Sequence, residues 1–145
     1  MRPGTFVIVP FILAAGSQAP APKAAAPVTI VGQVVDAACY MMHPQAASVT
    51  SHEECGQACA QRGVPLAIMD EKTMDLYVAD AASSKALLPH LHKSVRITGH
   101  SRRRAEPLQL EMPVGEKHTM SVQVDGGYNA LTVDDVVSIP QRKRH

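Results

Sequence analysis

The chain has 145 residues, and its 14 lysine and arginine side chains nearly balance its 13 aspartate and glutamate side chains, giving a formal net charge of +1. This balance excludes a protein that binds nucleic acid through overall basic charge. With two phenylalanines, three tyrosines and no tryptophan, the chain also lacks the aromatic residues of a base-stacking surface.

Residues 1–19 are predicted to be a signal peptide. A basic start precedes the apolar run Thr5–Ala15, which is too short to cross a bilayer as a helix. Cleavage is expected after Ala19, with Gly16 and Ala21 as alternatives, and a buried N-terminal strand is the competing interpretation of the run. The sequence thus predicts export to the periplasm or the extracellular space, with no integral membrane segment after signal removal.

The rest of the chain is expected to form a short linker and one domain. Residues 20–27 are rich in alanine and proline, which offer little to bury and favour extended backbone. Residues 28–145 are close to the common size of a single domain with one core. A second domain is not expected, and the oligomeric state is not determined by this pattern.

The first elements are a strand and a short helix. Val28–Val35 is β-branched and alternating, which predicts a strand that we expect to stay extended through Cys39. Ser51 and Glu54 have the spacing of a capping box, so a short helix should begin there and end before Gly63.

The later elements are mostly strands. Strands are expected at 66–69 and 74–79 around a turn at 70–73, and a second short helix at 85–91 with Ser83 or Ser84 as its cap. The pattern then predicts further strands at 94–99, 107–112, 119–124 and 130–139, with a turn at 125–127. This order favours a mainly β, OB-like barrel with two short helices, in which the cysteine-bearing helix is inserted between strands one and two. A generic β-sandwich or roll is the alternative.

All three cysteines lie between residues 39 and 59, and this segment is where we expect chemistry. On the predicted helix, His52, Cys55 and Cys59 share one face because residues three and four apart are neighbours. On an extended strand, the period of two would place Cys39, Met41 and His43 on one side.

These side chains predict a metal site. Thiolate, thioether and imidazole ligands favour copper, with zinc as the next choice and haem iron as a third. The Cys55 and Cys59 pair with His43 or His52 is similar to the ligand set of copper chaperones that assemble cytochrome oxidase, a resemblance limited to five residues. The expected partner is therefore a metal ion or a protein thiol, and enzymatic turnover is not expected.

A disulfide is the alternative interpretation of the same cysteines. In an exported protein, Cys39 joined to Cys55 or Cys59 would fasten the inserted helix to the first strand. Closing a loop of roughly 15 residues stabilises a fold by about 3 kcal/mol in the chain-entropy model. A thiol oxidoreductase using Cys55 and Cys59 is a weaker alternative, because their spacing is not that of a Cys-x-x-Cys motif.

The other histidines and the motif searches add no second site. We expect His90, His92, His100 and His118 to face solvent. The chain has no nucleophile-elbow, phosphate-loop or dinucleotide-binding motif.

The segments 32–39 (GQVVDAAC), 52–59 (HEECGQAC) and 63–65 (GVP) together resemble a largely uncharacterised group of small exported bacterial domains. The resemblance extends through 95–99 (VRITG). It implies export, a compact β-rich domain and a role for the cysteines. Gly56 costs the cysteine-bearing helix roughly 1 kcal/mol of intrinsic preference, so a fully regular helix is not expected there.

Overall fold

The computed structural model describes residues 24–43, 53–114 and 116–140. The signal peptide predicted at 1–19, His52 and the capping residue Ser51 lie outside these residues. The first strand, β1 (Ala26–Asp36), already begins inside the segment expected to be a linker.

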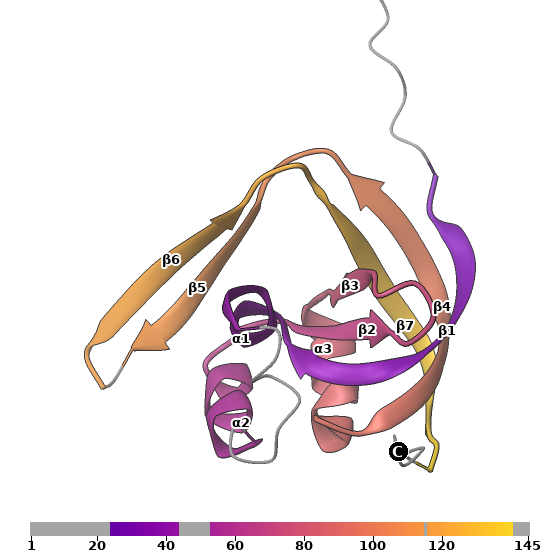
Figure 1. Ribbon diagram of the computed structural model, residues 1–145, viewed down its shortest axis with the longest axis horizontal. Helices are drawn as coiled ribbons and strands as arrows, with labels where there is room; N and C mark the ends of the chain where they lie inside the picture. Colours follow the sequence, from indigo (N-terminus) through magenta and orange to yellow (C-terminus); the bar gives the residue numbers. More distant parts are fainter. Residues whose placement is uncertain (1–23, 44–52, 115, 141–145) are drawn as a thin grey trace, which may run out of the picture.

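Five strands form a closed barrel in the order β1-β2-β3-β7-β4 (Figure 1). The other barrel strands are β2 (Leu66–Asp70), β3 (Leu76–Ala79), β4 (Ser94–Arg104) and β7 (Tyr128–Ser138). All neighbouring strands are antiparallel except β3 and β7, which pair in parallel. The prediction of a mainly β, OB-like barrel is therefore confirmed.

The remaining two strands, β5 (Leu108–Val114) and β6 (His118–Val124), pair only with each other. They form an antiparallel hairpin between β4 and β7 that projects from the barrel (Figure 1). We call this hairpin the arm. The arm returns to the barrel through a turn at Gly126 and Gly127, both with positive φ, as the sequence predicted.

In the described part of the chain, three α-helices accompany the strands, one more than predicted. They are α1 (Ala37–Met42), α2 (Glu53–Gln61) and α3 (Ala81–Leu87), the last continued by the 3-10 turn η2 (Leu88–His90). None of the described helices is both long and apolar enough to cross a membrane. The cap of α3 is Asp80, whose carboxylate accepts a hydrogen bond from Ser83 N at 2.8 Å, and not the predicted serine.

The extra helix α1 corrects the expected path of the first strand. The chain turns at Asp36, whose side chain caps α1 by accepting a hydrogen bond from Cys39 N at 2.9 Å. Because the backbone is helical from Ala37, the period-of-two arrangement of Cys39, Met41 and His43 is wrong. The alternating pattern of the strand ends at an aspartate that satisfies the first turn of a helix.

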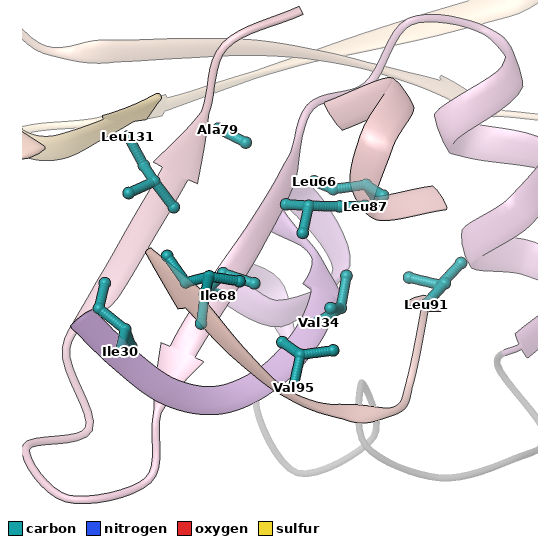
Figure 2. Close-up of a cluster of buried hydrophobic side chains, with 10 residues drawn as sticks. Ile30, Val34, Leu66, Ile68, Ala79, Leu87, Leu91, Val95 and Leu131 are labelled. Atoms are coloured by element: carbon teal, nitrogen blue, oxygen red, sulfur yellow. The ribbon is translucent and has the colours of Figure 1, made fainter. Parts of the chain in front are cut away.

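The buried residues form two clusters. The first fills the barrel and is shown in Figure 2; it includes Ile30, Val34, Leu66, Ile68, Leu87, Val95, Ile97 and Leu131. The second lies at the start of α1 and under the arm; it contains Val35, Ala37, Ala38, Cys59, Val64, Ala67, Val78, Leu108, Leu110 and Met112. The cysteines of the two helices meet in this second cluster, so the arm covers the region that carries them.

Candidate metal centre

Three side chains from two neighbouring regions come together beneath the arm. The ligand atoms of Asp36, Cys39 and Cys59 all lie within 4.8 Å of one another. Asp36 ends β1, Cys39 lies in the first turn of α1, and Cys59 lies near the end of α2. Two thiols and a carboxylate at this spacing are a suitable donor set for one metal ion.

The capping geometry fixes two of the three groups relative to each other. Asp36 Oδ1 accepts from Cys39 N, and His43 N donates to Cys39 O at 2.8 Å, so both ends of the short helix are held. Ala37 N donates to Pro65 O at 3.2 Å, which ties the start of α1 to the segment that follows α2. The thiol of Cys39 is therefore attached to a backbone that is anchored on both sides.

The third group is held by the end of α2. Cys59 O accepts hydrogen bonds from Arg62 N at 3.0 Å and from Val64 N at 3.1 Å. Cys59 is only 4% exposed, whereas Cys39 is half-buried. Neither thiol takes part in a disulfide within the part of the chain that the structure describes.

Asp36 is a buried acid, with 1% of its surface exposed. Burial raises the pKa of its carboxyl group above the ordinary value of 3.8, because desolvation penalises the charged form. The Cys39 N–H, the Cys59 thiol, the Ala38 N–H and the charge of His92 oppose this and lower the pKa, but the net shift is upward. A carboxylate oxygen buried beside two sulfurs is a position where a cation would offset the cost of burial.

His92 is half-buried, and its charge lowers the pKa of Asp36, which corrects the expectation that this histidine faces solvent. Both of its ring nitrogens are buried, and its backbone has a left-handed φ of 62°. Its N–H donates to Val34 O at 2.9 Å, so the residue is fixed against β1. A non-glycine residue in this backbone region is uncommon, although histidine adopts it more readily than most residues.

Gly56 explains how α2 approaches His92 so closely. A Cβ atom at residue 56 would lie 3.0 Å from His92 Nε2 and 3.1 Å from Leu91 Cδ2. The glycine that weakens the helix by propensity is thus the residue that lets the helix pack against the chain entering β4. The low helix propensity of Gly56 could be seen in the sequence, but its close packing against Leu91 and His92 could not.

The other predicted ligands do not join the three-residue group. Met41 is partly buried and packs against the second cluster, and His43 is exposed at the end of α1. Cys55 lies in α2 one turn before Cys59, and its side chain is outside the described residues, as is His52. Of the remaining histidines, His100 and His118 are exposed as predicted.

Asp36 is the member of the site that sequence reasoning missed. Its position between an apolar strand and two alanines is compatible with a helix cap, but its burial is not visible in the sequence. No family model, curated protein or solved structure matches this chain. The geometry of Asp36, Cys39 and Cys59 is therefore the basis for inferring a function.

Proposed function

We propose that this protein binds one thiophilic metal ion through Asp36, Cys39 and Cys59. The observation that carries the proposal is the mutual distance of at most 4.8 Å between one carboxylate oxygen and two sulfurs that come from separate elements. Asp36 also caps α1, but an ionised acid buried among apolar side chains lowers stability unless a partner compensates it, and a bound cation would do so.

The donor set is better suited to zinc than to the copper predicted from the sequence. The prediction of copper used the thioether of Met41, which packs against the second apolar cluster. Carboxylate oxygen with two thiolates is a combination that zinc accepts readily, whereas copper(I) prefers sulfur alone. Copper(I) is the alternative occupant, and a direct competition between the two metals distinguishes them.

A tetrahedral zinc ion needs a fourth donor, and two residues are available. The charge of His92 acts on Asp36 and both of its ring nitrogens are buried, but His92 lies outside the group of ligand atoms within 4.8 Å of one another, so its ring would have to move to donate. Cys55 is predicted from its spacing to share the helix face of Cys59. The variants Cys55→Ser and His92→Ala separate these choices, since only the true donor should change affinity strongly.

The test is a chelator competition on reduced, full-length protein with Zn²⁺ and, separately, Cu(I). Cys39→Ser and Cys59→Ser should each lower zinc affinity on the order of 100-fold, because each removes a thiolate ligand. Asp36→Asn should lower it by about tenfold or more. His118→Ala, on the exposed face of β6, is the matched control and should bind as the parent does.

Two results would contradict the proposal. One is a Cys39→Ser, Cys59→Ser double variant that is folded by circular dichroism and still binds zinc and copper(I) as tightly as the parent. The other is a parent protein that binds neither metal when fully reduced. Either outcome would leave the cysteines with a structural role, such as the disulfide that the sequence also allows.

A further inference from the structure

We infer that Cys39 and Cys59 also form a reversible dithiol–disulfide pair that exchanges with disulfide compounds. The inference concerns the same two sulfurs as the proposed metal site, but it does not require that metal is bound. It differs from the sequence-based alternatives in two respects. Unlike the Cys55 and Cys59 oxidoreductase, the pair spans two helices, and unlike the structural disulfide, its bond is exchangeable.

The two thiols differ in access, which gives each a separate task. Cys39 is half-buried and Cys59 is 4% exposed. Because Cys39 is the more exposed of the two residues, we assign it the attack on an incoming disulfide, whereas Cys59 is shielded within the second cluster. Their sulfurs are at most 4.8 Å apart, so a rotation of the more accessible side chain can bring them toward bonding distance.

The exchange balances as two successive substitutions at sulfur. The Cys39 thiolate attacks one sulfur of a small-molecule or protein disulfide, breaking its S–S bond and releasing the first thiolate. The Cys59 sulfur then attacks Cys39 and displaces the second thiolate, while the Cys59 proton is released to solvent. The two cysteines are oxidised to a disulfide, and the incoming disulfide is reduced to two thiols.

Metal binding and this bond exclude each other. A zinc ion needs both sulfurs as thiolates, and neither sulfur is available to it once they are joined. Oxidation by a disulfide would therefore release the ion, and bound ion would protect the thiols. This reciprocity couples the metal content of the site to the thiol–disulfide balance of its surroundings.

The experiment exposes reduced, metal-free, full-length protein to mixtures of reduced and oxidised glutathione. The products are trapped by acid and identified by intact mass and peptide mapping. We expect a Cys39–Cys59 disulfide whose population rises with the proportion of oxidised glutathione and falls again when reduced glutathione is added. Cys59→Ser should instead accumulate a glutathione adduct on Cys39, because the second substitution is removed.

Cys55 provides the matched control. Cys55→Ser should form the Cys39–Cys59 bond as the parent does, and Cys55→Ala serves if the serine variant is unfolded.

Bound zinc should protect the two thiols. Zinc at about 100 times its dissociation constant should slow the oxidation about 100-fold, because only about one hundredth of the protein is then metal-free.

Several outcomes would overturn the inference. They are a mapped bond that includes Cys55, a Cys55→Ser variant that forms no internal disulfide at any glutathione ratio, and a bond that reduced glutathione cannot reverse. Each is distinguishable from failure of the metal site. Reduced protein that binds zinc but never forms the bond refutes only this inference, and protein that forms the bond but binds no metal refutes only the proposed function.

Discussion

Two aspartates have the same structural task in this protein and opposite electrostatic surroundings. Asp36 caps α1 and Asp80 caps α3, each by accepting a hydrogen bond from the backbone N–H three residues later. Burial raises the pKa of Asp36. Burial alone would also raise the pKa of Asp80, but hydrogen bonds from Ser83 and Thr132 outweigh it and hold that pKa below 3.8.

The opposite shifts predict opposite effects of the same substitution. At neutral pH the ionised Asp36 is disfavoured in the fold, so Asp36→Asn, which retains a capping oxygen, should raise the free energy of unfolding of the metal-free protein. Asp80→Asn should lower it, by less than about 1 kcal/mol because the group is exposed to solvent. Urea denaturation at neutral pH measures both, and equal signs for the two variants would contradict the argument.

The dependence of stability on pH provides a further check on Asp80. Because its folded pKa is lowered, its contribution is complete above 3.8 and is lost as the pH falls through the folded value. The difference in unfolding free energy between the parent and Asp80→Asn should therefore shrink as the pH is lowered below about 4. A difference that stays constant down to acid unfolding would show that the charge of Asp80 does not stabilise the fold.

Among the elements, α2 is placed by close packing more than by its intrinsic preference. Gly56 lies in this helix with His92 Nε2 and Leu91 Cδ2 at contact distance from the position of a Cβ atom. A large side chain at this position must push α2 away from the chain that enters β4. The thiol of Cys59 would move with it.

Replacement of Gly56 by leucine tests this placement. We expect Gly56→Leu to destabilise the protein by about 1–3 kcal/mol through overpacking and to weaken zinc binding by displacing Cys59. Gln57→Leu, at the next and exposed position of the same helix, is the control for added bulk. Thermal unfolding and the chelator competition measure the two effects, and an unchanged affinity in folded Gly56→Leu would separate α2 from the site.

For the whole molecule, we expect both apolar clusters to contribute to stability but only the second cluster to influence metal binding. The first cluster fills the barrel, and the second carries Cys59 together with Leu108, Leu110 and Met112 of the arm. Leu110 is 2% exposed and Leu131 is 1% exposed, so truncation of either leaves a cavity. Only the cavity at Leu110 adjoins the residues that hold the thiols.

We therefore expect Leu110→Ala and Leu131→Ala each to cost about 2–5 kcal/mol of stability, whereas only Leu110→Ala should weaken metal binding by the folded protein. Chemical denaturation and chelator competition on both variants provide the comparison. If Leu131→Ala weakened zinc binding as much as Leu110→Ala, the site would depend on the barrel as a whole and not on the arm.

The sequence predicted the barrel well because most of its strands alternate between apolar and polar residues. In β4 and β5 the alternation appears directly in the burial of successive side chains. The boundary between β1 and α1 at Asp36 was missed. An aspartate after a strand can be either a turn residue or a helix cap, and only its hydrogen bond with Cys39 N identifies it as a cap.

The members of the candidate site were predicted in part for a similar reason. The cysteines were found because their chemistry is rare and their spacing is regular. Asp36 and His92 were missed because their relevance comes from burial, which depends on how β1, α2 and the start of β4 pack. No local pattern in the sequence contains that information.

The parallel pairing of β3 with β7 also determines when the molecule can finish folding. Val78 pairs with Ala130, and no neighbour in the chain can replace this distant contact. Contacts of such sequence separation slow folding, because the entropy of closing a long loop is lost before the contact forms. Because β5 and β6 lie between β4 and β7 in the chain, the arm that packs over Cys59 is joined to the barrel on both sides only after β7 has paired. The period before barrel closure is therefore when mispaired cysteines, Cys55 included, have their best opportunity to form.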